Sequence, residues 1–146
     1  MRIAIAVLVL ACAVASSRNA HAEAKHPVGV FVTMAQVTDR VERAAHIDVI
    51  RARLAACAQL ANKRVDVNVT RLTWVAVGES VEIQLELAFV MSVGNEIVAI
   101  ANQTAKLTLD KRQFNVAKLP SLRREVIVDA IGNLVVKLRR ITQRAV

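Results

Sequence analysis

The sequence contains few of the residues that build disulfides, metal sites or base-stacking surfaces. In 146 residues it has two cysteines, two prolines, four glycines, one tryptophan, three phenylalanines and no tyrosine. Because unpaired bases stack on aromatic side chains, this scarcity argues against nucleic acid as a partner, although the isoelectric point is about 10.5. No Cys, His and Asp residues have zinc-ligand spacing, so we expect no metal and no cofactor.

A long apolar run is also missing, apart from one near the start. Residues Ile3 to Ala15 are apolar, a run of about 13 where a membrane-spanning helix needs roughly 20. Met1-Arg2 gives a positive charge before this run, and Ala20-His21-Ala22 gives a small-residue cleavage site after it. These parts predict a signal peptide over 1–22. The rest, 23–146, is predicted to be one domain, secreted across the inner membrane into the periplasm.

A competing processing site lies inside the apolar run. Val9-Leu10-Ala11-Cys12 resembles a bacterial lipoprotein box, in which Cys12 would be lipidated and become the first residue. We favour cleavage after residue 22, because the run before Cys12 is short and apolar residues continue beyond it. Cleavage leaves Cys57 as the remaining cysteine, which excludes an intrachain disulfide. An exported chain without disulfides and rich in alanine, valine and arginine indicates a bacterial envelope protein.

Alternating apolar and polar residues predict four strands. The first is expected over 28–37. Three more follow between Val65 and Leu109, with turns at Gly78-Glu79-Ser80 and Ser92 to Glu96, and turns this short make the strands antiparallel. The alternation slips near Thr70-Arg71, which predicts a bulge. On the last strand, one face is expected to be apolar, with Ile97, Ala99, Ala101, Ala105, Leu107 and Leu109. The far half of the strand is polar and contains Asn102, Gln103, Thr104, Lys106 and Thr108.

Two helices complete the pattern. Apolar residues spaced by three and four predict a helix over 46–62, and Asp39 offers a cap, which leaves 39–45 as either helix or loop. Pro120 begins the second helix, whose apolar stripe continues to Ile141. The order β-α-β-β-β-α predicts an α+β fold, with a mainly antiparallel four-stranded sheet and two helices packed on one face. The place of the first strand in the sheet stays open.

Positive charge is concentrated in the last segment. Residues 23–110 contain nine Lys and Arg against ten Asp and Glu, whereas 111–146 contain nine against two. This asymmetry favours contact between the last helix and an anionic partner. The alternative is that the cations complement the helix dipole and add solubility. The candidate contacts are Arg123, Arg124, Lys137, Arg139, Arg140 and Arg144.

Two further pairs of residues are candidate sites in the strands. Arg71 and Trp74 lie beside the predicted bulge and would form a small groove, although for Trp74 alone a core position is the simpler expectation. Glu82 and Glu86 lie on the polar side of one strand. A pair of carboxylates can serve acid–base chemistry when one is desolvated, but a solvated sheet face explains them more simply.

The remaining cysteine and histidines give weak signals. Cys57 lies on the apolar stripe of the first helix, so we expect a small buried side chain rather than a reactive thiol. His26 and His46 have no neighbours in the sequence that would complete a metal or catalytic set. The sequence therefore predicts no enzyme.

The order of elements behind an export signal resembles small envelope domains of bacteria. The stretches VDVNVTRLTWVAVGESVEIQLELAFVMSVGNEIVAIANQTAKLTL and LPSLRREVIVDAIGNLVVKLRR carry the resemblance. It is to the domains of curli-secretion channel proteins, penicillin-binding-protein activator lipoproteins, the TolB N-terminal domain and the LPS-assembly lipoprotein LptE. The resemblance is one of pattern rather than motif and transfers no site residue. It implies a binding or adaptor module in the periplasm.

These observations predict an exported, non-enzymatic binding or adaptor module of the cell envelope. Its partner would be an envelope protein or an anionic envelope component. It would be recognised through a sheet edge, expected near Thr70 to Trp74, or through the basic C-terminal helix. One alternative is a lipoprotein anchored through Cys12. Another is a small-ligand carrier or hydrolase with a pocket between sheet and helices, lined by the odd-numbered residues 81–91. The sequence leaves the oligomeric state open.

Overall fold

The computed structural model describes residues 27–144, and the side chains of 27–141. The predicted signal peptide, Cys12 and His26 therefore lie outside the described residues. The order of helices and strands is the one that the sequence predicts, with two short 3-10 turns added. The elements are β1 Gly29–Met34, α2 Arg40–Ala55, η1 Ala58–Leu60, β2 Arg64–Val77, β3 Ser80–Val93, β4 Glu96–Asp110, η2 Val116–Lys118 and α3 Leu119–Arg144.

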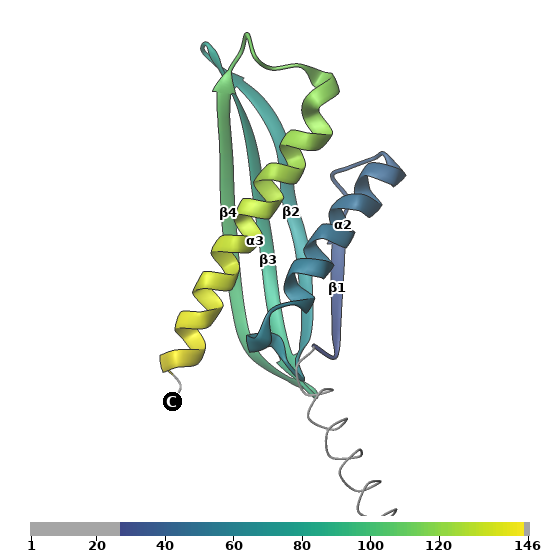
Figure 1. Cartoon of the computed structure of the whole chain (residues 1–146), viewed down its shortest axis with the longest axis vertical. Helices are drawn as coiled ribbons and strands as arrows, with labels where there is room; N and C mark the ends of the chain where they lie inside the picture. Colours follow the sequence, from purple (N-terminus) through teal and green to yellow (C-terminus); the bar gives the residue numbers. More distant parts are fainter. Residues whose placement is uncertain (1–26, 145–146) are drawn as a thin grey trace, which may run out of the picture.

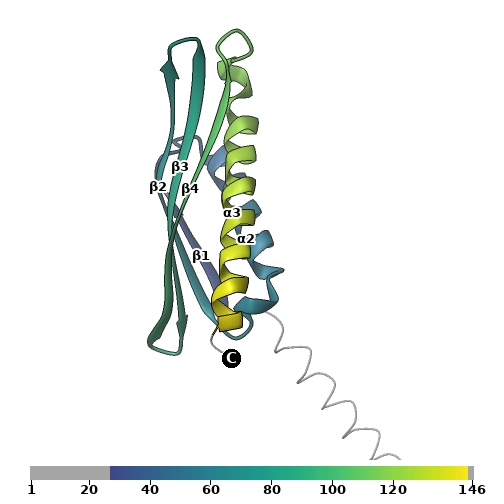
Figure 2. The same ribbon diagram turned by 90° about the vertical axis from the view of Figure 1, so that its left-hand side faces the viewer.

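The four strands form one sheet in the order β1-β2-β3-β4. β2, β3 and β4 are an antiparallel meander, whereas β1 runs parallel to β2. A parallel pair needs a long crossover, and α2 provides it. Both α2 and α3 lie on the same face of the sheet (Figures 1 and 2). The predicted α+β class and one-sided helical layer are confirmed, and β1 is the edge strand beside β2.

The sheet contains two irregularities, of which the sequence predicts one. The expected bulge is confirmed, because the register between β2 and β3 shifts between Val69 and Arg71. A second shift lies at the other end of β3, where Ser92 pairs with Ile97 and Val98 has no partner. The assignment of Ile97 to the inner apolar row of β4 is therefore wrong. This second bulge turns the side chain outward, and it is 63% exposed.

The first helix begins and ends earlier than the pattern predicts. Asp39 caps α2, and its Oδ1 accepts a hydrogen bond of 2.7 Å from the backbone N–H of Glu42, so most of 39–45 is helix. The expected end at 62 is wrong, because α2 stops at Ala55 and Cys57 has an extended backbone. This break lets Leu60, in η1, reach the core. Tertiary packing thus overrides an alanine-rich stretch that has no stop signal of its own.

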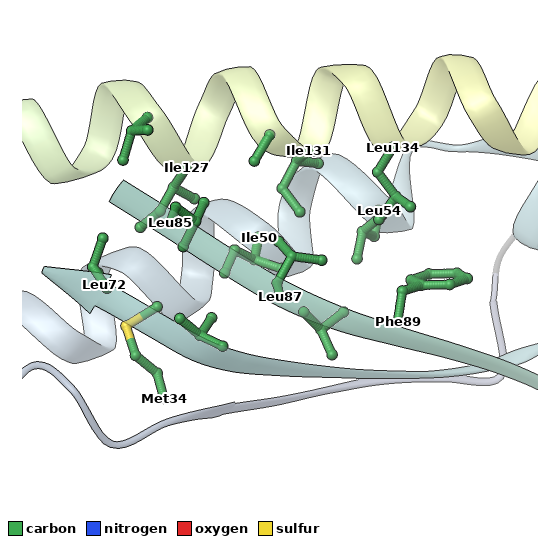
Figure 3. Close-up of a cluster of buried hydrophobic side chains, with 14 of the residues drawn as sticks. Met34, Ile50, Leu54, Leu72, Leu85, Leu87, Phe89, Ile127, Ile131 and Leu134 are labelled. Carbon is green, nitrogen blue, oxygen red and sulfur yellow. The ribbon is translucent and has the colours of Figure 1, made fainter. Parts of the chain in front are cut away.

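The core lies between the sheet and the two helices (Figure 3). Val65, Val67 and Val69 of β2 point into it, and after the bulge Leu72 continues the row. The odd-numbered residues 81–91 of β3 are all buried there. Both helices contribute large apolar side chains to it, among them Ile50, Leu54, Ile127, Ile131 and Leu134. The opposite face of the sheet is not covered by any element of the described chain (Figure 2).

Candidate recognition edge

β4 is the long free edge of the sheet. It has 15 residues, and β3 is its neighbour on one side while no strand of the described chain pairs with the other. An edge strand exposes a row of backbone N–H and C=O groups that can pair with an added strand, and proteins commonly block such edges with charges or proline. Between Ile97 and Leu109 the strand has no proline, and Lys106 is its one charged residue.

The basic half of α3 lies beside this edge. Figure 1 shows α3 crossing the sheet diagonally, so that its C-terminal end lies next to β4. The Nζ of Lys137 donates a hydrogen bond of 3.4 Å to the backbone carbonyl of Asn102, in the middle of the strand. The basic helix therefore forms one surface with the edge of β4, and not with the edge near Thr70 to Trp74 that the sequence predicts. We call it the β4–α3 edge.

A buried amide lies at the same place in β4. Gln103, which the sequence places in the polar far half of the strand, is buried. Its Nε2 donates to the carbonyl of Thr104 at 2.9 Å. Its Oε1 has no hydrogen-bond partner among the described residues. Because it pairs with Leu87, which is also buried, it shares the face that the helices cover.

The outer face of the sheet beside this edge carries ordered ion pairs. Lys106 donates from Nζ to Glu82 Oε1 at 3.0 Å, and Gln84 donates to the other oxygen of Glu82 at 3.1 Å. The hydrogen bond from Lys106, then that from Gln84, lowers the pKa of Glu82 below its ordinary value. Glu86 pairs instead with Arg71 at 3.1 Å. The two carboxylates thus have separate partners, and the shift for Glu82 is opposite to the one that a general acid requires at neutral pH.

The six basic residues of the predicted cluster do not form one patch. Arg123 and Arg124 lie in the first turns of α3, and a rise of 1.5 Å per residue puts them roughly 20 Å from Lys137. Arg123 is largely buried and donates from Nη1 to Glu42 Oε1 at 2.9 Å. The other five are Arg124, exposed near the start of α3; Lys137, at the β4 edge; Arg139 and Arg140, exposed in the last turns; and Arg144, whose side chain is not described.

Arg123 belongs to a polar cluster that sequence reasoning missed. Glu42 Oε1 also contacts His46 Nε2 at 3.1 Å, and the imidazole is 3% exposed, with no hydrogen-bond partner for Nδ1 in the described chain. The cluster joins α2 to α3. The i, i+4 spacing of Glu42 and His46 was a local signal. The arginine is 81 residues away from the glutamate, a separation that no local pattern reveals.

Arg71 and Trp74 lie on opposite faces of the sheet. Arg71 pairs with Glu86 on the outer face. Trp74 pairs with Ile83, which is buried, so its side chain lies on the face of the sheet that the helices cover. Trp74 itself is partly exposed, because it lies beyond the ends of the helices on that face. Its ring packs against Phe114 of the 111–118 connector, with centroids 4.9 Å apart. The two predicted groove residues are therefore not brought together.

The hollows of the surface are open rather than enclosed. The largest described, about 950 Å³, lies between the 111–118 connector, the end of β4 and the first turns of α3, and its wall includes Leu107, Phe114 and Leu122. The odd-numbered residues of β3 fill the space where a carrier would need a cavity. Cys57 is buried, and its thiol donates to Gln59 Oε1 at 2.9 Å.

The described residues contain neither a metal-binding group of side chains nor a membrane-spanning helix. Within 27–144, no three His, Cys, Asp or Glu side chains are grouped so that they could hold a metal ion. Nor does this part of the chain contain a helix with the length and apolar character needed to cross a bilayer.

Comparison with solved structures identifies the fold in bacterial proteins. A candidate lipoprotein from Caulobacter crescentus CB15 matches with a TM-score of 0.55 at 11% identity, over 80% of this chain and 92% of its own. Weaker likenesses are to a minor lipoprotein of Acinetobacter baumannii (TM-score 0.43, 18% identity, 75% and 88% coverage) and to PelC of Paraburkholderia phytofirmans, solved as a dodecamer (0.44, 15%, 74% and 88%). No family model and no curated protein matches the sequence. The likeness to the Caulobacter protein shows a shared fold, and membership in the curli-secretion, activator, TolB or LptE families stays a prediction.

Proposed function

We propose that this protein is an exported, non-enzymatic binding module of the bacterial envelope, which captures an extended acidic segment of an envelope protein along the β4–α3 edge. The contact between Lys137 and the Asn102 carbonyl carries the proposal, because it joins a strand edge without a partner to a basic helix. The segment would add a fifth strand to the sheet. Backbone hydrogen bonds would provide affinity in this mode, and side chains would provide selectivity.

Charge gives the expected selectivity. Lys106, on β4 itself, and Lys137, on the neighbouring helix, would flank the added strand. An acidic segment would gain from both cations, whereas a basic one would be repelled. Because these lysines are near the surface, we expect binding to weaken as the salt concentration rises.

Site-specific photocrosslinking in intact cells tests the edge. A photoreactive residue at Thr104 or Thr108, on β4, should capture a partner protein. The same residue at Gln84, in the central strand β3, should capture much less. Equal capture from Gln84 would place the partner on the sheet face and contradict edge addition. Replacing Lys106 and Lys137 by Gln should reduce capture at Thr104 several-fold, since each exposed charge contributes up to about 1 kcal/mol.

A matched control uses cations away from the edge. Lys111 and Arg112 lie in the connector after β4, and their replacement by Gln removes the same charge. This control variant should capture the partner as the unmodified chain does. If both double variants lose capture equally, the effect is one of net charge, and the proposed edge is wrong.

A second candidate function is an envelope lipoprotein tethered through Cys12. It is favoured by the description of the Caulobacter neighbour as a candidate lipoprotein. In that case the β4–α3 edge would still be presented by the same fold, but beside a membrane rather than free in the periplasm. The tether and the edge are separate properties with separate tests.

A further inference from the structure

Exposed apolar side chains gather at the end of the molecule that holds the β3–β4 hairpin, as they also do at the opposite end. The β3–β4 hairpin turns through Gly94-Asn95, and on its two sides Val93, Ile97 and Val98 are all about half exposed or more. Val28 is 77% exposed and lies at the same level, because its N–H bonds to the carbonyl of Lys63, next to the start of β2. The last turn of α3 also ends here (Figures 1 and 2). We call this the basal end.

The basal end is also rich in cations. Lys63 and Arg64 precede or begin β2, Arg53 lies in the last turn of α2, and Arg140 lies near the end of α3. The nearby acids are fewer. Asp66 is held by Arg64 in a two-bond contact of 3.0 Å, and Glu96 follows the hairpin turn. The basal end thus combines exposed apolar side chains with more cations than acids.

The opposite end of the sheet has a different balance. The β2–β3 hairpin also exposes Val75 and Val77, but Glu79 is in its turn. The neighbouring connector holds Asp110 beside Lys111 and Arg112, with Lys118 at its end. Both ends therefore carry a net positive charge by the residues named, and the charge is larger at the basal end.

The preceding part of the chain joins the domain at the basal end. The described chain starts at residue 27, next to the start of β1 (Figure 2). The apolar run, Cys12 and both candidate processing sites precede that point. A tether through Cys12 would therefore attach to the domain at its basal end.

We propose that the basal end docks on the surface of an anionic lipid bilayer, with the β3–β4 hairpin tip entering the headgroup region and the basal cations facing lipid phosphates. Peripheral proteins bind anionic membranes by burying apolar side chains shallowly and by placing Lys and Arg against the lipid phosphates. A second copy of the chain is a poorer fit. The hairpin tip has about six residues, whereas a stable interface uses roughly 20–30 residues a side. The proposal shares with the proposed function the export of the chain and does not depend on the β4–α3 edge.

Vesicle binding tests the proposal. The protein is purified after export from cells expressing the full chain with Cys12→Ser, which removes any lipid anchor. It should cosediment with vesicles of phosphatidylcholine and phosphatidylglycerol, and much less with phosphatidylcholine alone. Replacing Ile97 and Val98 by Ser should weaken binding about tenfold to hundredfold, because only the exposed half or so of each side chain would be newly buried in the bilayer. Replacing Lys63 and Arg140 by Gln should weaken it about fivefold per residue.

The opposite hairpin provides the matched control. Val75 and Val77 replaced by Ser should leave vesicle binding unchanged. A dye on Asn95→Cys should shift to the blue with vesicles, while Trp74 emission, from the other half of the sheet, should stay constant. Unchanged binding of the Ile97 and Val98 variant would overturn the proposal. So would a dimer that forms without vesicles and dissociates in that variant. A protein that does not bind vesicles but still crosslinks to a partner through Thr104 would contradict membrane docking and leave the proposed function standing.

Discussion

Single side chains can hold together elements that are far apart in the sequence, and Arg123 is an example. Its guanidinium meets Glu42 across the α2–α3 boundary, and their side chains are 17% and 13% exposed. Hydrogen bonds to charged groups contribute more than neutral ones, and removal of one partner leaves the other buried without its counter-charge. The residues that sequence reasoning grouped by charge are therefore divided by burial into a structural arginine and surface cations.

Replacing Arg123 by Ala should lower the free energy of unfolding by about 2 kcal/mol. Glu42 would lose its strongest partner and keep His46. The adjacent Arg124, which is exposed, is the matched control, and its replacement by Ala should change stability by less than about 0.5 kcal/mol. Urea unfolding followed by circular dichroism measures both. An equal loss of unfolding free energy in the two variants would mean that the buried ion pair stabilises the protein no more than an exposed arginine does.

The pKa of Glu82 provides a second test at this scale. The hydrogen bonds from Lys106 and Gln84 favour its charged form, so the pKa in the folded protein lies below the ordinary value of 4.5. This carboxylate therefore stabilises the fold above that ordinary value, and the contribution is lost as the pH falls through the lowered pKa. Replacing Lys106 by Gln should raise the pKa toward 4.5, as measured by NMR titration of the Glu82 side chain. Replacing Arg71 by Gln should leave it unchanged, and a wild-type value above 4.5 would refute the assignment.

Within elements, two glycines should respond in opposite directions to the same substitution. Gly132 lies in the middle of α3, and a Cβ built there has no atom within 4 Å. Alanine should therefore stabilise the protein by about 1 kcal/mol, because glycine is a poor helix former. Gly94 has a φ of +57°, and alanine should destabilise that turn by roughly 1 kcal/mol. Thermal unfolding of the two variants should show shifts of opposite sign; a lower midpoint for Gly132→Ala would mean that the helix requires the glycine.

The two bulges show which features of the strands can be predicted from the sequence and which cannot. The bulge at Thr70 was visible because the polar and apolar residues of β2 exchange places there. The bulge at Val98 was not, because residues 97–101 are apolar at every position and any register satisfies the pattern. In the same way Gln103 interrupts an inner row of alanines and leucines, and its burial depends on α3 covering it.

From the sequence, the recognition edge is expected near Thr70 to Trp74, and the basic helix is a separate surface. A free edge follows from any open sheet, but β1 could have paired with either β2 or β4, and its choice of β2 is what leaves β4 open. The positive charge of the last helix was evident, yet the direction of its axis across the sheet decides which cations reach the edge. Both facts are set by the crossover through α2 and by helix packing, which no local residue pattern encodes.

At the scale of the whole molecule, the core links elements from β1 to α3 and contains no residue before Met34 or after Leu138 in the described chain. How the leader is processed decides how the domain is held. We predict that the exported protein begins at Glu23, as the three-part pattern of residues 1–22 indicates. Intact-mass and N-terminal peptide measurements on the exported protein check this.

The Cys12→Ser variant completes that test, because cleavage after residue 22 removes Cys12 and should make the substitution silent. Export, mature mass and the distribution between membrane and soluble fractions should then equal those of the unmodified chain. A lipid-modified Cys12 at the new N-terminus, lost together with membrane association in Cys12→Ser, would refute cleavage after Ala22 and establish the tethered form. Membrane association that persists without the cysteine would come from the folded domain, and the substitutions at Ile97 and Val98 would then identify the surface responsible.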